Sequence, residues 1–307
     1  MIDLRGIETF FWAAQLGGFG LAARRLSTTQ PAVSQRIAAL ESALGVQLFV
    51  RGARHASLSA KGRELLPIAE QMLRLRSELL TTSGSTAAFR GRVRLGVAET
   101  VVHTRLVEIA RRVHATYPQI TLDIEVDTSQ NLHDRLLEGS LDIVILLGAV
   151  IEPNARSLDF ARYPLAWVAS PALDLPRRRL TLADIARFPV ITYARGSRPP
   201  LDVSDLFQRA GLREHQIFSN SSLSSIVKLC VEGMGVGMLP AAVAERELGS
   251  GELRLLRAAD ASVPDLAFTL NYLKTADIHL LEAIATLALD EGRTSRTACA
   301  RRTAPSG

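Results

Sequence analysis

The spacing of apolar residues changes near residue 90. The two patterns belong to different types of domain, so the chain is expected to contain more than one. Before that point apolar residues recur at intervals of three and four, which predicts amphipathic helices. After it, short β-rich runs (93–98, 121–129, 141–148, 163–171, 188–196 and 265–274) alternate with helical patterns (101–117, 130–138, 224–232 and 277–290). This alternation predicts an α/β unit with a mainly parallel sheet covered on both faces, either as one large subdomain or as two small ones.

The N-terminal residues have the outline of a helix-turn-helix. Apolar residues at 7, 10, 11 and 14 form one helical face, and residues 19–26 form a second short helix. Hydroxyls at 28 and 29 can cap a third helix, whose stripe at 33, 37, 40 and 44 ends at Gly45. Two short helices joined by a tight turn are typical of this motif. Residues 46–59 then predict two short strands around residues 52–54, a small wing.

A long helix is expected from Ser59. Its apolar residues step by three and four along a heptad seam, formed by Leu65, Ile68, Met72, Leu75 and Leu79. Such a seam requires a partner helix, so the pattern predicts dimerisation; the alternative is that the stripe packs on its own domain. A stretch rich in Ser, Thr, Gly and Ala (81–88) reads as a linker.

Charge and composition narrow the function classes. The net charge is +5, and residues 1–58 hold six arginines against three acids. Residues 291–307 hold four arginines against one acid, so the middle of the chain is close to neutral. A basic N-terminal unit favours a polyanionic partner. Long apolar runs, a secretory signal and clustered cysteines are not found, which favours a protein of the reducing cytoplasm without a membrane span.

Residues 19–49, FGLAARRLSTTQPAVSQRIAALESALGVQLF, closely resemble the winged helix-turn-helix of LysR-type transcriptional regulators, and the following RGARHASLSAKG continues the match. Further on, GRVRLGVAET, YPQITLDIEV, LLEGSLDIVILLG and GMGVGMLP resemble the effector domain of that family. The resemblance implies an α/β fold class. The chain is then expected to comprise an all-α winged helix-turn-helix (1–58), a linker and dimerisation helix (59–89) and a periplasmic-binding-protein-like effector domain of two subdomains (90–290). Subdomain I is expected at about 90–159 and 266–290, subdomain II at about 160–265, and a disordered basic tail at 291–307.

The resemblance also implies which residues meet DNA. Small residues on the outer face of the third helix let the backbone approach the groove, and Gln and Ser side chains can bond base edges. Wing arginines would sit over a phosphate or in the minor groove. The expected DNA-binding residues are Thr28, Thr29, Gln30, Pro31, Ala32, Ser34, Gln35, Arg36, Arg51 and Arg54.

The effector is expected at helix starts and loops that follow the strands. The matching positions are Glu99, Thr100, Val101, Thr128, Ser129, Arg195, Gly196, Ser197, Phe218, Ser219, Asn220 and Ser221. Hydroxyls and N–H groups at helix starts suit a carboxylate. Glu99 would repel an anion unless an arginine such as Arg195 paired with it, so an amino acid or a cationic ligand is the alternative. His103 could join the same pocket beside Thr100. Ordinary helix capping would explain the Ser and Thr residues equally well.

Other chemistry is weakly represented. Gly233, Gly235 and Gly237 lack phosphate-loop or Rossmann spacing and suit close packing at a sheet. No metal, cofactor or nucleophile motif is found in the sequence, so a non-enzymatic protein is expected. The expected partners are double-stranded DNA with an interrupted palindrome, a small-molecule effector, RNA polymerase and further copies of the chain, as dimer or tetramer. A solute-binding receptor that does not touch DNA and an enzyme on an α/β fold are the rivals.

Overall fold

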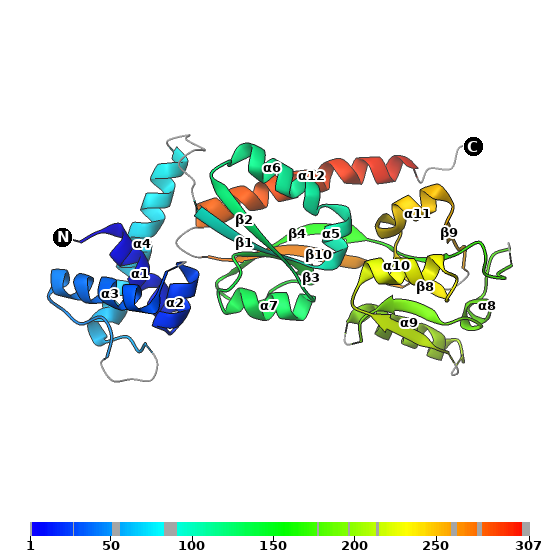
Figure 1. Cartoon of the computed structure of the whole chain (residues 1–307), viewed down its shortest axis with the longest axis horizontal. Coiled ribbons are helices and arrows are strands. Elements are labelled where there is room, and N and C mark those ends of the chain that lie inside the picture. The colour runs from blue at the N-terminus through cyan, green and yellow to red at the C-terminus, as the bar shows by residue number, and fades with distance from the viewer. Residues whose placement is uncertain are drawn as a thin grey trace.

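A computed structural model describes residues 2–26, 28–50, 56–82, 91–176, 178–195, 197–212, 215–258, 263–274 and 278–302 (Figure 1). At residues 77, 80–82 and 291–302 it describes the backbone alone. The helical N-terminal unit lies at one end of the molecule, and two sheets with their helices follow toward the other end.

The N-terminal unit contains the expected helices, α1 (Leu4–Gln15), α2 (Phe19–Arg25) and α3 (Gln30–Leu44). Local signals set their ends: the Asp3 carboxylate accepts from Gly6 N at 2.7 Å, and Gly45 terminates α3 with φ 69°. The inner faces enclose one apolar core in which Phe11 and Val33 are almost fully buried. The predicted periodic stripes of these helices are therefore confirmed.

The segment after α3 starts as a hairpin. Phe49 and Leu58 form an antiparallel bridge, and Val50 N donates to Ser57 O at 2.8 Å. The Glu41 carboxylate holds the start of the hairpin in place by accepting from Leu48 N at 2.7 Å. Residues 51–55, the predicted wing tip, lie outside the described residues.

The helix α4 (Ala60–Thr82) presents two apolar faces. Ala69 and Leu73 are buried in the core of the N-terminal unit, and Leu65 packs against that core. The rest of the predicted seam is exposed: Ile68 is 52% exposed, Met72 40%, Leu75 54% and Leu79 69%. Within the described chain, the seam therefore does not pack on its own domain beyond Leu65.

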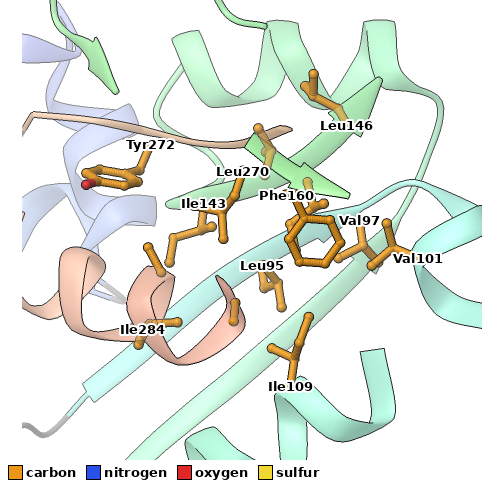
Figure 2. Packing of buried hydrophobic residues seen from close by; sticks show 14 of the residues in the cluster. Leu95, Val97, Val101, Ile109, Ile143, Leu146, Phe160, Leu270, Tyr272 and Ile284 are labelled. Atoms are coloured by element: carbon orange, nitrogen blue, oxygen red, sulfur yellow. The ribbon is translucent and has the colours of Figure 1, made fainter. Parts of the chain in front are cut away.

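The first sheet has the strand order β2-β1-β3-β10-β4. Its strands are β1 (Gly91–Val97), β2 (Ile120–Val126), β3 (Ile143–Leu147), β4 (Ala155–Tyr163) and β10 (Leu266–Leu273). The helices α6 (Leu106–Thr116) and α12 (Ile278–Arg302) cover one face, and α7 (Ser129–Leu137) covers the other (Figure 1). Ile143 of β3, Leu270 of β10 and Ile284 of α12 belong to one apolar core (Figure 2).

The second sheet has the order β7-β6-β8-β5-β9. Its strands are β5 (Leu165–Ala169), β6 (Val190–Tyr193), β7 (Ile217–Asn220), β8 (Val236–Pro240) and β9 (Arg254–Leu255). One face packs on α8 (Leu182–Ala186) and α9 (Arg198–Arg209). The other packs on α10 (Leu223–Val231) and the 3₁₀ helix η2 (Ala241–Ala244), which leads into α11 (Glu245–Ser250).

Gly235 and Gly237 permit close packing in the second sheet, as predicted. The prediction is wrong for Gly233, where a Cβ would meet no atom within 4 Å and the backbone instead has a left-handed φ of 71°. A Cβ on Gly235 would lie 2.2 Å from Pro189 O, and one on Gly237 would lie 2.6 Å from Cys230 Sγ. Cys230 is buried and unpaired, and its burial raises the pKa of the thiol to about 12.

The structure differs from the sequence predictions in several details. The sheets are mixed and not mainly parallel, because β10 runs antiparallel to β3 and β4, and β5 runs antiparallel to β8 and β9. The pattern at 101–117 is two helices, α5 (Glu99–Thr104) and α6, with a break at Arg105. The last helix continues to Arg302 instead of ending near residue 290, so residues 291–302 are not the irregular tail expected. They contain no proline, and Ala and Arg are favourable in helices.

Candidate functional site

The outer face of α3 presents small and polar side chains. Burial of Val33, Ile37 and Leu40 orients the helix. On the other side the exposed residues are Thr29, Gln30, Pro31, Ser34 and Gln35, with Thr28, Ala32 and Arg36 half-buried. Because the Thr29 hydroxyl accepts from Ala32 N at 3.4 Å, it caps the helix. Thus the predicted DNA residues up to Arg36 gather at the start of one helix, while Arg51 and Arg54 lie outside the described residues.

The N-terminal unit is joined to the first sheet by a buried charge cluster, which sequence patterns did not reveal. Arg25 Nη2, at the end of α2, lies 2.9 Å from Asp142 Oδ1, and both side chains are nearly buried. Asp142 also accepts from Arg94 N at 2.8 Å and from Arg94 Nη2 at 3.0 Å. The Arg25 guanidinium stacks over Trp12, 4.2 Å from the ring centroid. The Asp142 carboxylate thus pairs with two guanidinium groups, those of Arg25 and Arg94, which come from distant parts of the chain.

The expected effector residues lie at the carboxyl ends of parallel strands in both sheets. Strands β1 and β2 run parallel and lead into Glu99 and Thr128, while β6 and β7 end in register at Tyr193 and Asn220. In open α/β sheets, ligands bind outside these carboxyl ends.

Three contacts bring these two strand ends together. The Glu99 carboxylate accepts from Leu223 N, the first residue of α10, at 2.8 Å. The Thr100 hydroxyl lies 3.1 Å from the Tyr193 hydroxyl. His103 Nε2 lies 3.8 Å from Glu99 Oε1 and 3.4 Å from Ser224 Oγ. Burial raises the pKa of Tyr193, so its hydroxyl remains protonated and can donate to Thr100.

Several expected effector residues make structural bonds of their own. Thr128 caps α7 by accepting from Asn131 N at 3.3 Å, and Ser129 Oγ accepts from Leu147 N at 3.0 Å. Ser197 Oγ donates to Ala194 O at 2.6 Å, and Asn220 Oδ1 accepts from Ser222 N at 2.8 Å. Capping therefore explains Thr128, while Ser129 and Ser197 are held by other local or cross-strand bonds.

The other expected effector residues differ in their exposure to solvent. Val101 is fully buried in the core of the first sheet (Figure 2). Arg195, Phe218 and Ser221 are exposed, and Ser219 is half-buried. The Glu99 carboxylate accepts from Leu223 N, and within the described residues no ion pair joins it to Arg195. Gly196 lies outside the described residues.

Sequence reasoning missed Tyr193 and Ser222. Ser222 caps α10 by accepting from Ser225 N at 3.3 Å, and a serine before an apolar helical run is a recognisable cap signal. A buried tyrosine hydroxyl usually finds a partner, but the sequence does not show that this partner is Thr100.

The described part of the chain has neither a metal-binding cluster nor a membrane-spanning helix. There, His, Cys, Asp and Glu side chains form no cluster that could hold a metal ion. None of the helices in this part is both long and apolar enough to cross a bilayer.

Two family models match the chain. Residues 4–63 match the bacterial regulatory helix-turn-helix protein, lysR family, and residues 86–292 match the LysR substrate binding domain. The SDS degradation transcriptional activation protein of Pseudomonas sp. is 32% identical over 84% of this chain and 86% of its own length. The regulator BbuR of Bordetella bronchiseptica is 28% identical over 82% of this chain and 78% of its own.

A solved structure supports the same fold. Full-length CbnR in complex with its target DNA superposes with a TM-score of 0.52 at 21% identity, covering 95% of this chain and all of that one. The chain belongs to the LysR family: it is a LysR-type transcriptional regulator, in which a helix-turn-helix DNA-binding domain precedes an effector-binding domain.

Proposed function

We propose that this protein is a one-component sensor in the cytoplasm and not an enzyme. It dimerises on double-stranded DNA, and a small molecule bound between the two sheets changes its action on RNA polymerase. The observation that carries the proposal is that one N-terminal unit exposes both a polar face, on α3, and an apolar seam, on α4. The helix-turn-helix match argues against a solute receptor, and the relatives named above are regulators. A ligand can shift promoter activity only by preferring one arrangement of the subunits.

The seam predicts the form of the DNA site. Pairing two α4 helices brings two copies of α3 into one symmetric particle, and a two-fold particle fits two half-sites of an interrupted palindrome. A dimer is the minimal form, and a tetramer built from two such dimers through effector-domain contacts is the alternative. Light scattering of the purified protein distinguishes the two masses.

The domain division follows the sheets. We place the DNA-binding domain at 1–58, the linker helix at 59–89 and the effector domain at 90–290. Because β4 stays in the first sheet as far as Tyr163, the first crossing between subdomains falls at Pro164. Subdomain II then extends to about residue 265, and the chain returns to the first sheet at β10.

Replacing Gln30 or Ser34 by alanine is expected to weaken binding to the specific site while leaving binding to random DNA nearly unchanged. The loss of a base contact costs about 1–3 kcal/mol, roughly 5- to 150-fold in affinity. Fluorescence anisotropy on both DNA types, at fixed salt, measures the two affinities. Matched controls are Gln119→Ala and Ser42→Ala, both exposed and away from the proposed contacts. An equal loss on specific and random DNA would contradict direct base reading by α3.

The ligand class is inferred from Glu99. Its carboxylate already bonds Leu223 N at the start of α10, so an anion meets an occupied amide and a like charge. An ammonium group would instead be attracted to this carboxylate. We therefore favour an amino acid or another ligand with an ammonium group over a simple carboxylate.

Glu99→Gln is expected to remove the response to such a ligand. Each of the common amino acids is added to the wild-type protein, and the shift in thermal unfolding midpoint is recorded. An amino acid that stabilises the wild type should lose at least tenfold in affinity with Glu99→Gln, but not with Glu108→Gln, an exposed acid on α6. Unchanged affinity in Glu99→Gln would rule out the ammonium contact, and a response to dicarboxylates alone would restore the carboxylate alternative.

A further inference from the structure

A basic cavity lies at the far end of the second sheet, away from the N-terminal unit. It has a volume of about 790 Å³ and lies beside the edge strand β9, which Figure 1 shows at the end of the molecule opposite α1–α4. Of its described lining residues, four are arginines and none is acidic: Pro176, Arg178, Arg179, Leu180, Arg254, Leu255, Leu256, Arg257 and Ala258.

Backbone bonds hold the walls of this cavity together. Leu180 N donates to Arg257 O at 2.7 Å, and Leu180 and Ala258 form a parallel bridge. Leu256 N donates to Trp167 O at 2.9 Å, which ties the second wall to β5. The arginines are therefore carried on segments fixed to the sheet.

One of the arginines is neutralised by an acid, whereas the other three form no ion pair with any residue that the structure describes. Arg178 makes a two-pronged pair with Asp184, with distances of 2.8 and 2.9 Å, and this pair holds the pKa of Asp184 far below its usual range. Arg254 Nη2 donates to Leu175 O at 3.1 Å, while its buried Nε has no hydrogen-bond partner. Among the described residues, Arg179 and Arg257 make no ion pair and donate no side-chain hydrogen bond.

Positive charges gathered in this way repel one another, and an anion with several charges would offset the repulsion. Guanidinium groups bind carboxylate and phosphate oxygens in pairs, which favours planar or multiply charged acidic groups. The volume lies within the range of about 300–1,000 Å³ typical of small-molecule sites, and Leu255, Leu256 and Pro176 offer apolar surface for a carbon skeleton.

We infer that this cavity binds a small polyanion, a metabolite with two or more carboxylate or phosphate groups, at a site separate from the one at Glu99. The protein would then respond to two ligands of opposite charge preference. This inference does not depend on the identity of the ligand at Glu99.

Calorimetric titration with citrate and with fructose 1,6-bisphosphate, at constant ionic strength, tests the inference, with glucose as the uncharged comparison. The diagnostic variant is Arg179→Gln with Arg257→Gln, because neither side chain supports the fold through a described bond. The matched control is Arg209→Gln with Arg246→Gln, two exposed arginines of α9 and α11 that do not line the cavity.

We expect at least one probe to bind saturably to the wild type and to the control. The same probe should bind the diagnostic variant at least tenfold more weakly. The diagnostic variant should bind specific DNA like the wild type, which separates this site from the DNA-binding function. If neither probe binds saturably, or if the diagnostic variant binds as tightly as the wild type, the inference is overturned.

Discussion

Replacing Asp142 by asparagine is expected to lower the free energy of unfolding by about 3–5 kcal/mol, because it removes the negative charge that two nearly buried arginines share. Asp142 is 6% exposed and serves both Arg94 and Arg25. Asparagine keeps the size of the side chain but cannot neutralise either guanidinium. For a domain of about 200 residues, this loss corresponds to a fall of roughly 10 °C in the unfolding midpoint. Calorimetry or urea denaturation measures it directly.

The matched control is Asp123→Asn. Asp123 pairs with Arg92 at 2.9 Å, but the two side chains are 36% and 56% exposed. Exposed pairs contribute about 0–1 kcal/mol, so this variant should unfold close to the wild type. If Asp142→Asn is no less stable than Asp123→Asn, the buried cluster does not stabilise the protein in the way proposed.

Introducing charge on the α4 seam, by Met72→Glu together with Leu75→Glu, is expected to weaken the dimer by at least 100-fold. Each side chain of this size contributes about 1.5–3 kcal/mol when buried at an interface, and the new carboxylates would have to lose their water. Sedimentation velocity over a concentration series measures the dissociation constant. Binding to the palindromic site should weaken in parallel, since each half-site would be held by a separate chain.

Arg74→Glu is the control for this experiment. Arg74 is exposed on α4 and lies outside the seam residues, so its replacement tests the effect of charge without disrupting the seam. A seam variant that still dimerises like the wild type would show that α4 does not pair through Ile68, Met72, Leu75 and Leu79.

Local patterns determined much of this protein in advance. The stripe at Val33, Ile37 and Leu40, together with the stop at Gly45, is sufficient to define α3 and to leave Gln30 and Ser34 on its outer face. Helix periodicity and caps depend on neighbours within a few residues, so sequence alone reports them well. The family resemblance then assigned the α/β effector domain, which the family models confirm.

The direction and pairing of the strands could not be predicted from local sequence patterns in the same way. β10 follows subdomain II in the chain but inserts between β3 and β4 with antiparallel register, and a strand's apolar pattern does not encode its neighbour's direction. The short strands β7 and β9 have too few residues for a clear periodic signal.

By itself, the sequence determined the helix-turn-helix, its outer face and the apolar seam of α4, because these depend on short-range spacing. Only the tertiary structure decided that Asp142 serves Arg25 and Arg94, that Glu99 bonds the start of α10, and that four arginines line one cavity. The physical reason is common to all three, because each arrangement brings together groups that are far apart in the chain. Their burial and charge compensation depend on distances that exist only after folding.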